Sequence, residues 1–178
     1  VLGLVTKSIF FNQLGAEFNG LNGTFTSIIS MLALTELGVG TAIIVNLYKP
    51  LAEDDRPKIT ALMQLYGKVY RIIAGVVFVL GLCVSPFIQF ALNETDRGDF
   101  NAWYLSGVFM LFVLDMVVSY LMAYKRSIIT ADQKNYLITI VHTVAVVLMN
   151  ALLIAFLYWT KSFVAYLVVR IVFRFLEN

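Results

Sequence analysis

The sequence predicts an all-α integral membrane protein, built as one polytopic bundle of transmembrane helices over residues 1–178. Of the 178 residues, 60% are hydrophobic and 13% are charged, whereas soluble domains contain about 45–50% apolar and about 25% charged residues. The apolar residues form continuous runs and do not alternate with polar ones, which favours helices over the strands of a membrane barrel. The net charge of +2 gives no indication of nucleic-acid binding.

The first apolar segment, residues 1–11, has the pattern of the last turns of a helix and contains Lys7. Because the chain begins inside this segment and ends inside another helical pattern, we expect it to be a fragment of a longer protein. Residues 12–20 hold Asn and Gly at turn positions and predict a loop. The next apolar segment, about residues 21–48, is long enough as a helix to cross a bilayer.

Glu36 lies near the middle of this second segment and is followed closely by Gly38 and Gly40. A charge at the centre of a bilayer costs about 2.5–3.5 kcal/mol on insertion scales, so it usually faces other helices or a water-filled cavity. We therefore expect the remaining helices to pack around a cavity of this kind.

The following polar stretch, residues 49–71, predicts a surface segment. Acidic residues precede Pro57, which suits the first turn of a helix. Apolar residues at spacings of three and four over residues 57–71 then predict an amphipathic helix on the cytoplasmic surface. This helix leads into a third span, residues 72–92, where Pro86 predicts a kink near the far end.

Three more apolar runs predict a fourth, a fifth and an incomplete sixth span over residues 103–124, 136–159 and 163–178. Asp115 lies near the middle of the fourth span, and the fifth contains His142 and Asn150. The sixth contains Arg170 and Arg174, which lie about one helical turn apart and therefore on one face.

Basic residues cluster in two of the connecting segments, residues 49–71 and 125–134. These segments lie on the same side of the membrane if the spans alternate in direction. By the positive-inside rule that side is the cytoplasm. Within the second segment, Asp132 and Lys134 predict a local ion pair or cap.

Three long stretches of the chain carry a family likeness: FNQLGAEFNGLNGTFTSIISMLALTELGVGTAI, NLYKPLAEDDRPKITALMQLYGKVYRII and YLMAYKRSIITADQKNY. Together they resemble the Wzx-type polysaccharide repeat-unit flippases of Gram-positive bacteria. Those proteins belong to the MOP flippase superfamily, which also holds the MATE multidrug exporters and the lipid II flippase. The resemblance covers nearly the whole chain but only the N-terminal half of such a flippase.

The resemblance implies a transporter in the bacterial cytoplasmic membrane that moves an undecaprenyl-diphosphate-linked oligosaccharide from the inner to the outer leaflet. Alternating access of two helical bundles is the implied mechanism. The implied partners are the lipid-linked substrate, membrane lipids, the missing C-terminal half of the same chain and a polysaccharide polymerase. We expect no cofactor, although protons or sodium could drive transport, and the sequence contains no constellation that predicts an enzyme.

A diphosphate that crosses a low-dielectric region needs cations inside the bundle. Lys7, Arg170 and Arg174 are the candidates for the substrate cavity, together with the carboxylates of Glu36 and Asp115. Each carboxylate could pair structurally with a cation, which we favour, or could titrate and couple transport to an ion. Flippases of this kind often have Arg where this chain has Lys7, and Lys lacks the bidentate fork of Arg.

Other functions remain open at this point. The main alternative is a cation-coupled small-molecule exporter of the MATE type. A membrane enzyme acting on polyprenyl-linked sugars is disfavoured because the outer loops are short, and a non-transporting scaffold is a third alternative. For His142, a hydrogen-bonded role is favoured over a proton relay.

Overall fold

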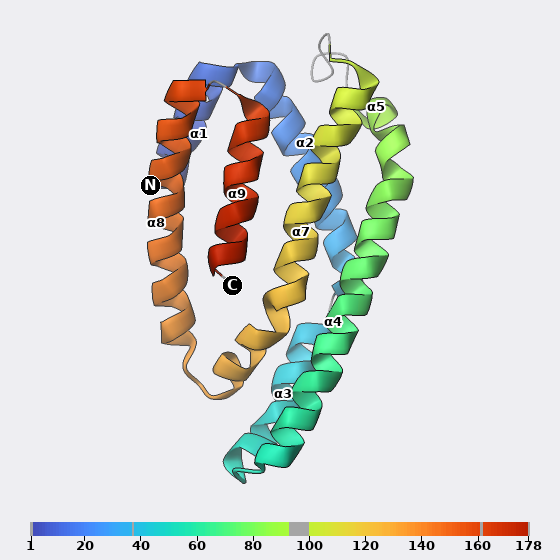
Figure 1. Ribbon diagram of the computed structural model, residues 1–178, viewed down its shortest axis with the longest axis vertical. Coiled ribbons are helices and arrows are strands. Elements are labelled where there is room, and N and C mark those ends of the chain that lie inside the picture. Colours follow the sequence, from blue (N-terminus) through green and yellow to red (C-terminus); the bar gives the residue numbers. More distant parts are fainter. Residues whose placement is uncertain (1, 37, 93–99, 161, 178) are drawn as a thin grey trace.

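The computed structural model describes residues 2–36, 38–92, 100–160 and 162–177, and nearly all of them are helical (Figure 1). No strand occurs in these ranges, so the protein is all-α as the sequence predicts. The helices are α1 (Leu2–Leu14), α2 (Ala16–Leu32), α3 (Val39–Ala52), α4 (Arg56–Val84), α5 (Ile88–Ala91), α7 (Ala102–Ala131), α8 (Asn135–Thr160) and α9 (Phe163–Glu177).

Three of the described helical segments are long and apolar enough to cross a membrane. They are Arg56–Phe87, Ala102–Ala131 and Asn135–Phe156. In the last of them only 11% of the most apolar window is buried within the protein, so most of α8 presents aliphatic side chains outward. An outward apolar surface of this length is typical of a helix that contacts lipid.

The N-terminal region differs from the sequence prediction. A loop was expected over residues 12–20, but α1 and α2 are separated by Gly15 alone. Gly15 has φ 93° and ψ 178°, a conformation that is essentially confined to glycine. One glycine is therefore enough to reverse the chain. Of the other residues that suggested a loop, Asn12 lies in α1, and Asn19 and Gly20 lie in α2.

The second predicted span, residues 21–48, is not one helix. It consists of α2, a 3₁₀ turn at Ala33–Glu36, and α3, which begins after Gly38. Gly38 has φ 87° in the left-handed region, where an L side chain would be strained. The glycine that follows Glu36 thus breaks the span into two helices.

The amphipathic segment and the third span, expected over residues 57–71 and 72–92, form the single helix α4. Its N-terminus is capped by Asp55, whose side chain accepts a 3.1 Å hydrogen bond from the Lys58 amide. Pro57 stands in its first turn, where the missing amide proton costs nothing. The helix ends at Val84 and a 3₁₀ turn containing Pro86 follows, in agreement with the expected kink.

The other spans have bounds close to those expected, except at the end of α7. This helix continues seven residues beyond the expected 103–124 and ends at Ala131. No Pro or Gly interrupts residues 125–131, so the helix continues through them. Lys125 and Arg126 therefore lie on a helix and not in a loop.

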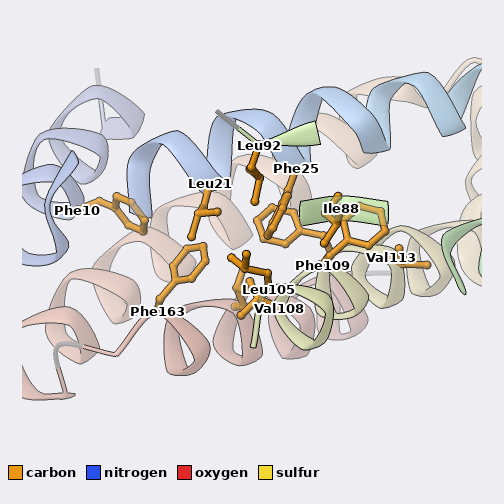
Figure 2. Close-up of a cluster of buried hydrophobic side chains, with 12 residues drawn as sticks. Phe10, Leu21, Phe25, Ile88, Leu92, Leu105, Val108, Phe109, Val113 and Phe163 are labelled. Atoms are coloured by element: carbon orange, nitrogen blue, oxygen red, sulfur yellow. The ribbon is translucent and has the colours of Figure 1, made fainter. Parts of the chain in front are cut away.

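Helix α7 is the centre of the packing, because both apolar cores include its side chains. In the first core, Figure 2 shows Leu21 and Phe25 of α2 pointing toward α7. The ring of Phe25 packs edge-on against those of Phe109 and Phe112, with both pairs of centroids 5.5 Å apart. The second core joins α3, α4 and α7 through buried side chains that include Leu47, Tyr66, Tyr70, Met116 and Tyr120.

The turns that follow α3 and α7 lie at the same end of the molecule, shown at the bottom of Figure 1. This arrangement brings the basic residues of the α3–α4 turn and of residues 125–134 to one end, as the sequence predicts. Asp132 and Lys134 form the expected ion pair there. Their hydrogen bond raises the pKa of the Lys134 amine, because it stabilises the protonated form.

A buried polar contact joins the first helix to the fifth predicted span. The Thr6 hydroxyl donates a 2.6 Å hydrogen bond to Oδ1 of Asn150, and Nδ2 of Asn150 donates to the Val146 carbonyl at 2.7 Å. Both Thr6 and Asn150 are buried. Interhelical hydrogen bonds of this kind hold apolar helices together in the absence of a hydrophobic driving force.

The variant Asn150→Ala is expected to lower the free energy of unfolding by about 1 kcal/mol, the usual magnitude for an interhelical hydrogen bond in a membrane protein. Thr143→Ala is a suitable control on the same helix, since the Thr143 hydroxyl is exposed and bonds only within α8, to the Thr139 carbonyl. Denaturant titration of both variants in mixed micelles measures the difference. Equal stability of the two would show that the Thr6–Asn150 contact contributes nothing.

Candidate functional site

A charged cluster joins α7 to α9 inside the apolar bundle. Arg170 donates to Oδ2 of Asp115 from Nη2 at 2.8 Å and from Nε at 3.2 Å. Arg174 donates from Nε to Oδ1 and from Nη2 to Oδ2, both at 3.2 Å. One carboxylate therefore holds two guanidinium groups, and the second of them binds it in the bidentate manner that fits Arg to carboxylate.

The local sequence explains why these three residues meet. Arg170 and Arg174 are four residues apart on α9, so they project from one face. Asp115 is only 5% exposed on α7, one turn after Phe112. The Arg170 guanidinium lies over the Phe112 ring, 4.7 Å from its centroid, in a cation–π contact that favours the charged group in this setting.

A cavity of about 260 Å³ lies beside the cluster, and α2, α7 and α9 line it. Its charged lining consists of Asp115, Arg170 and Arg174. The hydroxyl-bearing residues of the lining are Thr26 and Ser30 of α2 and Ser119 and Tyr120 of α7. The site therefore combines cations with hydroxyl groups against an apolar wall.

The charge balance of the cluster is positive, since one carboxylate faces two guanidinium groups. Arg170 is the more buried cation, with 20% of its side chain exposed, whereas 36% of the Arg174 side chain is exposed. Asp115 fixes both arginines in place and neutralises one charge, so the net charge of the three residues is positive. Such an arrangement attracts an anion while keeping the cost of burying two like charges low.

Glu36 and Lys7 are the other two residues that the sequence predicts for the site. The backbone of Glu36 closes the 3₁₀ turn that begins at Ala33, and Ala33 lines the cavity, but the Glu36 side chain lies outside the described part of the structure. Lys7 is exposed on α1, which packs against α2 and α8. Among the described residues that line the cavity, Lys7 is absent.

Sequence reasoning missed several contributors to the site. The cation–π partner Phe112 and the hydroxyls of Ser119 and Tyr120 become apparent only once α7 and α9 are packed together. For Thr26 and Ser30 a signal was present, because two hydroxyl residues spaced four apart lie on one face of an apolar helix. Asn150 was noted within its span, but its bond to Thr6 could not be inferred.

No family model, curated protein or solved structure matches this chain.

Proposed function

We propose that this chain is one half of a membrane flippase for undecaprenyl-diphosphate-linked oligosaccharides, working by alternating access. The observation that carries the proposal is the Asp115–Arg170–Arg174 cluster, which holds two guanidinium groups on one buried carboxylate beside a cavity within an apolar helical bundle. The resemblance of three long stretches to Wzx-type flippases suggests the substrate class. The three helices long enough to cross a membrane supply the setting.

The chemistry of the cavity fits the charged end of such a substrate. Guanidinium groups bind phosphate oxygens in the same fork geometry that they use for carboxylates. The volume of about 260 Å³ corresponds to about nine water molecules at about 30 Å³ each. This space can hold a diphosphate, and the hydroxyl groups of Thr26 and Ser30 would meet the first sugar.

Asp115 acts in this proposal as the residue that positions the two arginines. An incoming diphosphate competes with the carboxylate for the same guanidinium donors. Release of Arg174, the more exposed of the two cations, would expose two of its donors to the substrate without moving α7. We place the basic end of the bundle, which holds the turns after α3 and α7, on the cytoplasmic side.

The test uses the full-length gene in its parent cell. Deletion is expected to make the lipid-linked glycan accumulate in a form protected from a membrane-impermeant label, and the wild-type gene should restore labelling. The neutral triple variant Asp115→Asn, Arg170→Gln and Arg174→Gln should insert at a normal level yet fail to restore it. Arg56→Ala, which removes a cation that is 84% exposed in its side chain, is the matched control and should restore it fully.

The other outcomes of this experiment decide between functions. Unchanged labelling after deletion would overturn the flippase proposal and favour a MATE-type exporter of small molecules. Full restoration of labelling by the triple variant would show that the cluster does not bind the substrate. Lys7→Ala belongs in the same series, because failure of that variant would assign a substrate contact to α1 in addition to the cavity.

A further inference from the structure

Tyr166 lies on α9 about one turn before Arg170, on the same face as the two arginines of the cluster. A side-chain hydrogen bond joins Tyr166 to Arg170. The hydroxyl oxygen is the acceptor in this bond, since a guanidinium group can only donate. Tyr166 is therefore a further polar member of the Asp115 cluster, and it contributes from α9.

The ring of Tyr166 is held by aromatic neighbours. It packs edge-on against Phe10 of α1, with centroids 5.0 Å apart, and stacks on Phe163 of α9 at 6.3 Å. Phe163 in turn contacts Phe112 of α7 at 6.4 Å. These three phenylalanines are buried. Side chains from three helices thus form one aromatic layer, which fixes the hydroxyl group of Tyr166 beside Arg170.

The two arginines of the cluster differ in their surroundings. Arg170 binds Oδ2 of Asp115, at 2.8 Å from Nη2, and its guanidinium group also contacts the Phe112 ring. The five N–H donors of a guanidinium group are enough for these contacts and for the bond to Tyr166. Arg174 binds Asp115 at 3.2 Å and is the more exposed cation. Arg174 is therefore more accessible to a ligand than Arg170.

The burial of Asp115 limits how the cluster can respond to an anion. Only 5% of this residue is exposed, so departure of both guanidinium groups would leave an unpaired buried charge, which is strongly destabilising. An anion can therefore take one arginine from the carboxylate at low cost, but not both. The contacts of Arg170 with Phe112 and Tyr166 favour Arg170 as the one that stays.

We propose that Tyr166 is a positioning residue, which keeps Arg170 on Asp115 while a bound diphosphate takes Arg174. The inference rests on the proposed function, because it assigns separate roles to the two arginines of the same cavity. Asp115 then stays neutralised throughout, and Arg174 returns to a carboxylate that is still in place when the anion leaves. The cluster can thus bind and release a diphosphate without leaving a buried charge unpaired.

The test follows the two arginines separately by NMR of the purified full chain, with isotope-labelled arginine, in detergent micelles. Arg170→Gln and Arg174→Gln assign the two Nε–H resonances, each by the signal that it removes. Titration of the wild type with inorganic pyrophosphate is expected to shift the Arg174 resonance and to leave that of Arg170 in place. In Tyr166→Phe, which keeps the ring and removes only the hydroxyl group, both resonances should shift, because Arg170 has lost one of its anchors.

Tyr104→Phe is the matched control for this substitution. Tyr104 is a partly buried tyrosine of the same apolar core, stacked on Phe100, and it lies about three turns before Asp115 on α7. Its titration should match that of the wild type, and circular dichroism should show both variants to be folded. Calorimetry should find that Arg174→Gln binds pyrophosphate at least tenfold more weakly than the wild type, as expected for loss of a charged partner.

The outcomes separate this inference from the proposed function. A wild-type Arg170 resonance that shifts as far as that of Arg174, or a Tyr166→Phe titration identical to that of the wild type, would overturn the positioning role and leave the flippase proposal standing. If pyrophosphate shifts neither resonance, or binds Arg174→Gln as tightly as the wild type, the cavity does not bind a diphosphate through this cluster. That result would overturn the inference together with the observation on which the proposed function rests.

Discussion

Replacement of Asp115 by Ala is expected to lower the free energy of unfolding by about 3 kcal/mol, the low end of the cost of breaking a buried ion pair. The variant removes the carboxylate that holds two guanidinium groups four residues apart on α9. The low end of the range applies because 36% of the Arg174 side chain is exposed and water can screen it. Denaturant unfolding of the full chain in mixed micelles measures the loss.

Two further variants make this result specific to the cluster. Asp132→Ala removes the carboxylate of an exposed ion pair, and exposed pairs contribute little, so its effect should be small. The apolar triple variant Asp115→Leu, Arg170→Met and Arg174→Met should recover most of the stability, since a well-packed apolar set often replaces a buried ion pair without loss. Wild-type stability in Asp115→Ala would show that the carboxylate does not hold the two helices together.

Replacement of Gly81 by Ala is expected to cost about 1–3 kcal/mol through overpacking between α4 and α7. A Cβ atom at this position would lie 2.6 and 2.7 Å from the two γ-methyl groups of Val113 and 3.2 Å from its Cβ. Contacts this short force the helices apart, because Val113 is β-branched and has little rotamer freedom to move away. Small residues at helix interfaces permit such close approach in membrane proteins.

Gly75 provides the matched control for this substitution on the same helix. A Cβ atom there would meet nothing within 4 Å, so Gly75→Ala should be neutral or stabilise by up to about 1 kcal/mol through helix propensity. The double variant Gly81→Ala, Val113→Ala should recover part of the loss, since it removes both methyl groups that clash. A Gly81→Ala variant as stable as Gly75→Ala would contradict the close packing of α4 on α7.

The sequence was sufficient to predict those features that depend on local pattern. Apolar runs predicted α8 and α9 almost to the residue, and the four-residue spacing of Arg170 and Arg174 predicted their common face. The loop expected over residues 12–20 was wrong, because composition does not reveal that one glycine with positive φ can reverse the chain. The length of α7 was underestimated because charged residues signal a membrane boundary and not the end of a helix.

The candidate site was predictable only in part, for a physical reason. Asp115 and Arg170 are 55 residues apart, and spacing along a chain does not specify which helices pack side by side. Their chemistry still limited the possible partners of Asp115, since a carboxylate within an apolar helix needs a cation. The structural pairing that we favoured for Asp115 agrees with the structure. The identity of its cationic partners could be learned only from the packing of α7 against α9.

The length of α4 has a mechanical consequence. Its 29 residues extend about 43 Å at 1.5 Å per residue, whereas the hydrocarbon core is about 30 Å thick. In Figure 1 the α3–α4 pair continues past the α7–α8 turn, and a shared buried core that includes Leu47, Tyr66 and Tyr70 stiffens the pair. The pair therefore acts as a rigid arm. Any tilt of α4 within the bilayer moves the turn at Asp54 further than it moves the opposite end of the helix.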